Sequence, residues 1–535
     1  MKILYFNGKI YTGTNFVDSF IEEDGKFLDV GSYDSLKLIP HDKEVDFKGK
    51  TVTAGFNDSH LHILGYGYSL TMVDLVGTQS IEEIIQRIRN YIDKEKPEKG
   101  KWIIGRGWNQ DYFVNEKRFP TKEDLDLISK DYPIYIMRVC FHVTCVNSLG
   151  LSLANINENT PNPDGGEIEK DSNGKLTGIV KENAQYMVYT VVPKPTLEDI
   201  KKMLFNATTK LNQFGITSAQ SDDFTCFDIP YDTVIQAYQE LEKEGKLNVR
   251  INQQFQIKTP SALEGFIAKG YQTGYGSDKF KIGPLKLLGD GSLGARTAFL
   301  QEPYSDDPSK IGILVYKQEL LENLIKIAHN NNIQVAIHAI GDGMMKILID
   351  TIEKVSRENP KPDIRHGIVH CQIMDEKILN KFTELKLLAY IQTIFIDYDI
   401  TIVKQRIGEK RAKFSYNFKT LQDSGVNISN GSDCPVETPN PMAGIQCAVT
   451  RQDIKGKFEP YLAEQALSIE EAVKSYTMNG AFASFDENKK GQIKKDMISD
   501  FVIWDKDIFT SDVHNIHVIQ PLQTFLGGKL VYQKN

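Results

Sequence analysis

The sequence of 535 residues predicts an α/β fold: a (β/α)8 TIM barrel, a small β-sandwich domain built from both chain ends, and an α+β segment inserted after the first barrel strand. Eight strand-like apolar runs, most of them joined by amphipathic helical patterns, predict the barrel. Short strands with turn signals at both chain ends predict the sandwich. A doubly wound sheet is the alternative, and it fits eight units less well.

The eight predicted barrel strands are short and rich in aliphatic residues. They are 52–58, 216–221, 247–254, 283–288, 334–340, 366–371, 387–393 and 425–432. Helix starts are marked by the capping boxes Ser80-x-x-Glu83 and Ser468-x-x-Glu471. In such a barrel the carboxyl ends of all eight strands form one rim, and the active site lies there.

Three domains follow from these patterns. Asn7-Gly8 and Gly527-Gly528 punctuate strand-like runs, so residues 1–52 and 488–535 form the predicted small β domain. Residues 53–97 and 191–487 form the predicted barrel. The turn-rich residues 98–190 form the predicted insertion, at a connection where barrel enzymes carry lids and specificity elements.

Composition excludes several classes of function. Lys and Arg number 63 against 71 Asp and Glu, a net charge of -8, which offers no basic field to nucleic acid. No apolar run approaches the roughly 20 residues of a spanning helix, and the first residues lack a signal-peptide pattern. Six scattered cysteines suit neither a disulfide scaffold nor a CxxC zinc site. We expect a cytoplasmic protein with a small-molecule substrate, no nucleic-acid or membrane partner, and a homodimer as one open assembly.

Polar residues that bind metals end several of the predicted strands. His60 and His62 lie two positions apart, so both imidazoles face the same side of a strand. His338, His370 and Asp433 end three later strands. In a barrel these five side chains lie together at the carboxyl ends of the strands, which predicts a divalent metal site. Zinc is the commonest metal for such ligands.

Lys286 is unusual because it lies inside the apolar run 283–288, with no carboxylate beside it in sequence. A buried, unpaired ammonium is costly. The side chain therefore reaches solvent, pairs with a distant acid, or is altered chemically. Reaction with CO2 would give a carbamate, an anionic oxygen ligand that can bridge two divalent ions.

The order of these motifs resembles the amidohydrolase superfamily, and within it the N-substituted formamide deformylase-like group. The resemblance covers nearly the whole chain. It is carried by Gly55–His62, Lys286–Gly294, His338–Asp342, Val369–Gln372, Gly431–Val436 and Gly527–Tyr532, with Gly165–Ile168 and Gly178–Ala184 supporting the insertion.

The resemblance implies a ligand set and a reaction. The superfamily's pattern maps onto His60 and His62 on strand one, N-carboxylated Lys286 on strand four, His338 and His370 on strands five and six, and Asp433 on strand eight. One or two divalent ions per chain, zinc by preference, would be bound, with Glu182 as a substitute ligand. The implied reaction is hydrolysis of an amide or N-substituted formamide bond, with Asp433 as general base and then acid. His338 would be a second catalytic residue, as a donor to the oxyanion.

Two other functions stay open at this point. One is a mononuclear, deaminase-type amidohydrolase, and the other is a non-catalytic binding or regulatory protein on a hydrolase scaffold. Further residues are candidates for metal or substrate binding, each with a structural alternative: His142, Asp290, Arg296, Trp108 and Glu182. For Asp290 and Arg296 the structural interpretation is favoured, and Trp108 suits an aromatic core equally well.

Overall fold

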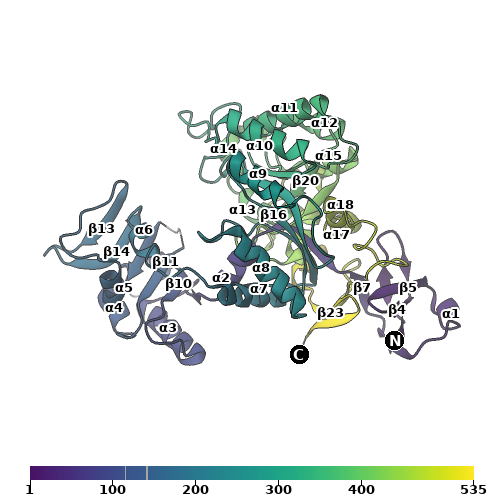
Figure 1. Ribbon diagram of the computed structural model, residues 1–535, viewed down its shortest axis with the longest axis horizontal. Helices are drawn as coiled ribbons and strands as arrows, with labels where there is room; N and C mark the ends of the chain where they lie inside the picture. The colour runs from purple at the N-terminus through teal and green to yellow at the C-terminus, as the bar shows by residue number, and fades with distance from the viewer. Residues whose placement is uncertain (115, 140–141, 535) are drawn as a thin grey trace. The chain divides into compact units, whose positions relative to one another are not determined.

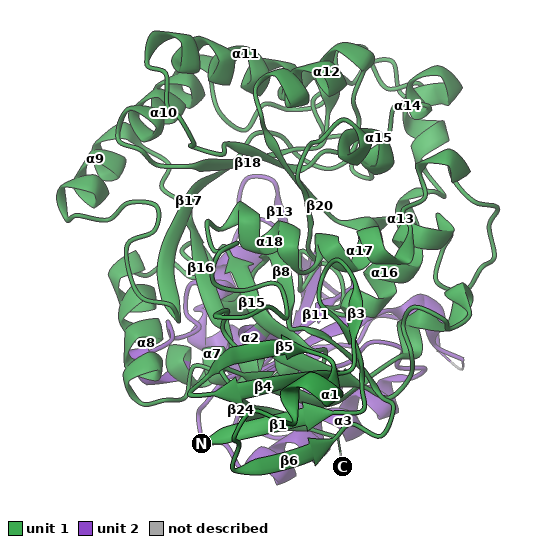
Figure 2. Ribbon diagram, turned by 90° about the vertical axis from the view of Figure 1, so that its right-hand side faces the viewer, with its two compact units in different colours: residues 1–66, 200–535 green, residues 67–199 purple. Residues whose placement is uncertain are grey.

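The computed structural model describes residues 1–114, 116–139 and 142–534. The chain forms two compact units, Met1–Tyr66 with Ile200–Asn535, and Gly67–Asp199 (Figure 2). The second unit therefore includes the helix α3 (Ile81–Glu95), which the sequence-based division assigned to the barrel. The domain boundaries 53–97, 98–190 and 191–487 stay predictions. No helix in the described ranges has both the length and the apolar character needed to cross a bilayer.

The first unit contains an eight-stranded sheet whose strands are all parallel and follow chain order. The predicted (β/α)8 barrel is thereby confirmed. Asp433 N donates to His60 O at 2.8 Å and His62 N donates to Cys434 O at 2.8 Å, so the last strand's end meets the first. The strands are β8 (Phe56–Leu61), β15 (Ile216–Ser221), β16 (Arg250–Phe255), β17 (Phe280–Leu288), β18 (Val335–Ala339), β19 (Gly367–His370), β20 (Leu388–Ile391) and β21 (Ile428–Asn430).

The predicted strand 52–58 is wrong as a single element. It consists of β7 (Thr51–Ala54), which belongs to another sheet, and β8, the first barrel strand. Gly55 joins them, and a Cβ there would collide with the Thr217 side chain. Both strands are fully buried, so the apolar pattern runs through the junction without a break.

Helices follow the barrel strands along the chain (Figure 1). In Figure 2, α9 to α12 lie outside β17 and β18. The α-helices of the first unit from β8 onward are α2 (Ile63–Ser69), α7 (Leu197–Asn212), α8 (Tyr231–Lys243), α9 (Pro260–Ala268), α10 (Gln318–Asn330), α11 (Asp342–Glu358), α12 (Glu376–Glu384), α13 (Ile396–Asp399), α14 (Val403–Ala412), α15 (Phe418–Asp423), α16 (Pro441–Thr450), α17 (Ile469–Ser475) and α18 (Met478–Ala483).

Both ends of the chain build the small β domain. One sheet has the order β5-β4-β1-β6 and the other β24-β23-β22-β7-β2-β3. Aromatic rings fill the space between them, with Phe501 stacked on Phe525 at 4.3 Å. The elements are β1 (Lys2–Phe6), β2 (Lys9–Tyr11), β3 (Phe16–Val17), β4 (Ser19–Glu23), β5 (Lys26–Gly31), α1 (Tyr33–Leu36), β6 (Lys43–Asp46), β22 (Phe501–Trp504), β23 (Pro521–Leu526) and β24 (Lys529–Gln533).

The second unit is an α+β structure around a six-stranded sheet of order β13-β14-β12-β11-β10-β9. It has two apolar cores, one including α3 and Trp108, the other including Tyr135 and Val188. Its elements besides α3 are β9 (Val73–Asp74), β10 (Ile103–Trp108), α4 (Lys122–Asp126), β11 (Ile134–Arg138), β12 (Val143–Val146), α5 (Ser148–Leu153), β13 (Gly166–Lys170), β14 (Leu176–Glu182) and α6 (Gln185–Tyr189).

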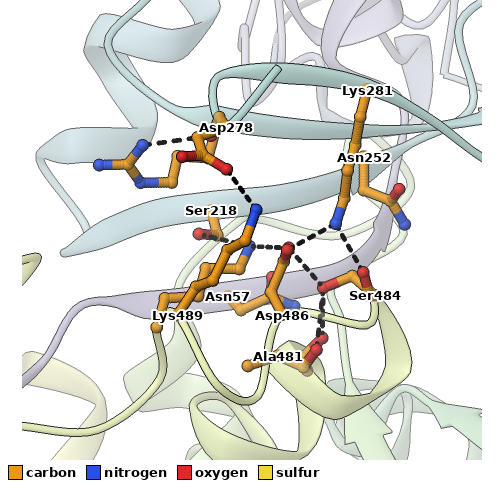
Figure 3. Close-up of polar contacts among 12 residues, drawn as sticks. Asn57, Ser218, Asn252, Asp278, Lys281, Ala481, Ser484, Asp486 and Lys489 are labelled. Carbon is orange, nitrogen blue, oxygen red and sulfur yellow. Dashed lines mark hydrogen bonds and ion pairs between the residues drawn. The ribbon is translucent and has the colours of Figure 1, made fainter. Parts of the chain in front are cut away.

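Charged and polar side chains form a network at the amino ends of barrel strands (Figure 3). Lys281, near the start of β17, lies 2.7 Å from Asp486, which follows α18. The buried Lys490 donates to Ser218 Oγ at 3.0 Å. Arg250 binds Asp500 through two hydrogen bonds of 2.7 and 3.0 Å. These pairs tie the segment before β22 to the barrel, at the opposite strand ends from the predicted metal ligands.

Candidate metal centre

The six predicted ligands come from five strands of one barrel. Most of them lie at or just beyond the carboxyl end of their strand, where the side chains project into the rim. They are His60 in β8, His62 directly after it, Lys286 in β17, His338 in β18, His370 at the end of β19 and Asp433 three residues after β21.

The carboxylate of Asp433 contacts the imidazoles of His60 and His62. Its Oδ1 lies 3.3 Å from His60 Nε2 and 3.2 Å from His62 Nε2. His60, His370 and Asp433 are all buried, and each offers a ligand atom within 4.8 Å of the others. Nitrogen and carboxylate oxygen are the donors that zinc and similar divalent ions accept, so the residues present fit such an ion.

The proton positions on three imidazoles suit metal binding. Nδ1 of His60 contacts Gln254 Oε1 at 2.7 Å, Nδ1 of His62 contacts Asp222 O at 2.7 Å, and Nδ1 of His370 contacts Gln392 Oε1 at 2.6 Å. Each of these oxygens accepts a hydrogen bond, so Nδ1 carries the proton. The lone pair of each Nε2 is then left for a metal.

His338 presents its other nitrogen. Its Nε2 lies 3.0 Å from Gly291 O, a carbonyl that can only accept, and 3.3 Å from Asp290 Oδ1. The Nε2 proton is therefore committed, which leaves Nδ1 as the free lone pair. The ring centre is 4.4 Å from that of His370. This geometry suits a ligand and does not support the predicted role of His338 as an oxyanion donor, because its N–H already has a partner.

Lys286 is 1% exposed, and its amine makes no hydrogen bond or ion pair with any described residue. Burial lowers the pKa of its amine, while the charges of Asp222 and Asp433 raise it. A lowered pKa increases the fraction of neutral amine, which is the form that reacts with CO2. Of the three interpretations of this lysine, burial without a direct partner excludes the one in which it reaches solvent.

The backbone at the site is held in an uncommon conformation. His370 has φ 83°, Cys371 has φ 51° and Asp433 has φ 56°, all in the left-handed region that residues other than glycine seldom adopt. Burial raises the pKa of the Asp433 carboxyl, but the adjacent imidazoles of His60 and His62 outweigh this and hold it well below its usual range. Asp433 is thus an anion in the chain without metal. The left-handed backbone of His370, Cys371 and Asp433 is strained, and strained backbone is concentrated at functional sites.

Sequence reasoning missed the residues that support the ligands. Asp58, Gln254 and Gln392 are each almost fully buried and hydrogen-bonded at the site. A signal existed for Asp58 and Gln392, because each is a polar residue in a largely apolar predicted strand, whereas Gln254 lies in the predicted strand 247–254 among several other polar residues. No partner could be assigned to them from sequence.

Three of the weaker candidates have structural partners. Trp108 is fully buried in the second unit, where its Nε1 donates to Ile136 O at 3.1 Å, an environment that suits the aromatic-core alternative. Arg296 forms two hydrogen bonds with Asp306, of 3.0 and 2.8 Å. Asp290 accepts from the backbone N of Phe299, Ile340 and Gly341 at 2.8 to 3.0 Å. These two residues act as structural ties, as favoured above.

His142 and Glu182 both lie in the second unit and bind each other. His142 Nδ1 is 2.8 Å from Glu182 Oε2, and both side chains are exposed. Positions 140 and 141, directly before His142, lie outside the described residues. Their suggested contribution to metal or substrate binding stays a prediction.

A parallel barrel with imidazoles and a carboxylate at its strand ends defines the class of metal-dependent barrel hydrolases. The model of the Amidohydrolase family matches residues 43–532. The chain therefore belongs to the amidohydrolase family, as the sequence motifs implied, and this supports a hydrolase that acts on carbon–nitrogen bonds.

Individual proteins agree with this assignment. The chain is 32% identical to YtcJ of Bacillus subtilis (strain 168) over 100% of both chains. It is 23% identical to the N-substituted formamide deformylase of Arthrobacter pascens, over 95% of this chain and 94% of the other. A solved structure, an uncharacterized metal-dependent hydrolase from Pyrococcus horikoshii OT3, is similar with a TM-score of 0.79 and 32% identity, over 96% of this chain and 99% of that one.

Proposed function

We propose that this chain hydrolyses an amide or N-substituted formamide bond of a small molecule at a divalent metal site. The ligands are His60, His62, His338, His370 and Asp433, with Lys286 as a sixth in its N-carboxylated form. The observation that carries the proposal is the set of three acceptors at Nδ1, which directs three Nε2 atoms toward the centre. The formamide deformylase relative favours this bond type.

Asp433 performs the proton transfers in the proposed reaction. A bound divalent metal supplies hydroxide at neutral pH and polarises the substrate carbonyl. Asp433 Oδ1 contacts the two imidazoles, which leaves Oδ2 to accept the proton of the attacking water. The water oxygen bonds to the carbonyl carbon, the C–N bond breaks, and Asp433 Oδ2 returns the proton to the leaving nitrogen. The products are a carboxylate, or formate, and an amine.

The state of Lys286 determines the number of metal ions. An N-carboxylated Lys286 would supply an anionic oxygen ligand for two ions, whereas the unmodified lysine would suit a single-ion site. Isolation of Lys286 from any direct partner in the described chain supports the modified form. Zinc is the proposed metal because imidazole and carboxylate suit it, although manganese, iron and nickel accept the same donors.

Metal content per chain tests the proposal most directly. Protein purified without chelator or histidine tag is measured by elemental mass spectrometry and assayed on amides and N-substituted formamides. About two divalent ions and release of amine with carboxylate support the proposal. One ion with release of ammonia indicates a deaminase. Absence of metal after reconstitution with metal and bicarbonate would leave a binding or regulatory role. The cytoplasmic location and the homodimer stay predictions.

A further inference from the structure

Two buried glutamines support two of the proposed ligands from behind. Gln254 in β16 is 0% exposed and Gln392, directly after β20, is 1% exposed. Their Oε1 atoms lie 2.7 and 2.6 Å from Nδ1 of His60 and His370. These are the shortest polar contacts of the two imidazoles, so the glutamines determine how each ring is held.

An amide has two ends, and the contacts of Gln254 define which end faces the ring. Its Nε2 donates to Ser59 O at 3.1 Å, so its Oε1 must be the atom that meets His60. Turning the amide over would place Oε1 against the Ser59 carbonyl, where two acceptors repel each other. Gln254 therefore reaches across β15 and holds both the ring of His60 and the peptide before it.

Gln392 makes the same arrangement on the other side of the centre. Its Nε2 lies 3.4 Å from Tyr390 O, on its own strand, while Oε1 accepts from His370. The two remaining imidazoles are backed by main-chain carbonyls instead, His62 by Asp222 O and His338 by Gly291 O. Every one of the four rings thus faces an acceptor whose direction is fixed.

We infer that Gln254 and Gln392 are positioning residues that keep the proton of His60 and His370 on Nδ1 and reserve both Nε2 lone pairs for a divalent metal. The inference rests on the proposed function. Both backing groups are neutral amides, so they orient the ligands without adding charge to a centre that already holds Asp433. Outer partners of this kind typically change metal affinity 10- to 100-fold.

Zinc affinity of the metal-free full chain tests the inference without any substrate. Gln254→Met removes the acceptor and preserves the approximate volume. Gln254→Glu, in the protonated form that burial favours, restores both an acceptor for His60 and a donor for Ser59 O. The matched control is Gln253→Met, one position away in β16, because Gln253 is equally buried and contacts only Gln254 O within the described residues. Zinc is titrated against a chelating indicator, and thermal unfolding of each metal-free variant confirms folding.

We expect Gln254→Met to weaken zinc binding about 10- to 100-fold. Gln254→Glu should stay within about threefold of the unaltered chain, and Gln253→Met should not change it. Equal weakening by Met and Glu would mean that the side chain serves packing alone, and unchanged binding by Gln254→Met would remove it from any role. Either result overturns the inference and leaves the proposed metal site intact. Failure of the unaltered chain to bind zinc overturns the proposed function, and the inference with it.

Gln392→Met gives an independent measurement should Gln254→Met fail to fold. Long-range proton–nitrogen NMR on histidine-labelled protein adds a second readout, since the chain has 10 histidines. We expect protons on Nδ1 of His60, His62 and His370 and on Nε2 of His338. In Gln254→Met the His60 signal alone should lose its single Nδ1–H form. A His60 proton on Nε2 in the zinc-loaded, unaltered chain would contradict the inference.

Discussion

Ser432 Oγ donates to Asp58 Oδ2 at 2.6 Å, although the two residues lie 374 positions apart. Ser432 N also donates to both carboxylate oxygens at 3.1 Å, and His60 N donates to Oδ1 at 3.2 Å. A single buried carboxylate thus joins the first barrel strand to the segment after the last one. His60 is itself a proposed ligand, and Ser432 directly precedes the proposed ligand Asp433. The hydrogen bonds of Asp58 therefore set the spacing between His60 and Asp433.

Asp58→Asn should destabilise the chain by about 1–3 kcal/mol, because an amide cannot accept from all of these donors. Ser432→Ala, which removes only the hydroxyl, should cost about 0.5–1.5 kcal/mol. Chemical unfolding of both single variants and the double variant measures the coupling between them. Fully additive effects would contradict a direct tie between the two residues.

Asp433→Asn should keep most of the bound metal yet lower turnover at least ~100-fold, because an amide cannot take up the water proton at neutral pH. The measurements are kcat on the best amide or formamide substrate and metal content of the same preparation. Activity close to that of the unaltered chain would exclude Asp433 as the proton-transfer residue.

His60→Ala should lose bound metal while the fold is kept. The side chain offers Nε2 to the centre, and its other described contacts are the hydrogen bond to Gln254 and ring contacts with His62 and His370. Elemental analysis of the purified variant checks this, with His514→Ala as the control because that histidine is exposed and far along the chain. A full complement of metal in His60→Ala would refute ligation by His60.

His366 should make the fold sensitive to acid. It is 2% exposed, its Nδ1 accepts from Val335 N at 3.1 Å, and its Nε2 lies 2.9 Å from His329 Nδ1. Burial lowers the pKa of His366 to about 3, with a smaller contribution from His329. Since the unfolded chain takes up this proton near pH 6.5, the stabilisation is complete above that pH and is lost progressively as pH falls toward 3.

The size of this effect between pH 6.5 and 5 is about 2 kcal/mol, at 1.36 kcal/mol per pH unit. His366→Asn keeps an acceptor for Val335 N and removes the titration. Its free energy of unfolding should therefore fall less steeply between pH 7 and pH 5 than that of the unaltered chain. Parallel pH profiles of the two proteins would exclude His366 as the acid-sensitive group.

The barrel and the ligand positions could be predicted because both depend on local patterns. Short apolar runs indicate buried strands, and a polar residue that ends such a run is expected at the carboxyl-end rim of the barrel. His60, His370 and Asp433 satisfy that rule, and the structure brings them together. The order of the motifs along the chain also indicated the family.

Other features depend on contacts between distant segments. The roles of Gln254 and Gln392 come from atoms on other strands, which one sequence does not reveal. The junction at Gly55 was hidden because β7 and β8 are both fully buried, and only the neighbouring Thr217 shows why a glycine is needed. Trp108 was ambiguous since an aromatic residue suits a core and a pocket equally, until its partner Ile136 O was known.

The pairing of β7 with β22 in the small β domain also determines when this protein can finish folding. Trp504 Nε1 donates to Thr53 Oγ1 across a separation of 451 residues. At about 5–20 residues per second, a ribosome delivers β22 roughly 20 to 90 s after β7. Throughout that interval the apolar strand β7 can pair with β2 but lacks β22, its second neighbour in the sheet. Until β22 emerges, the unpaired edge of β7 is therefore the part of the small β domain that most needs protection from aggregation.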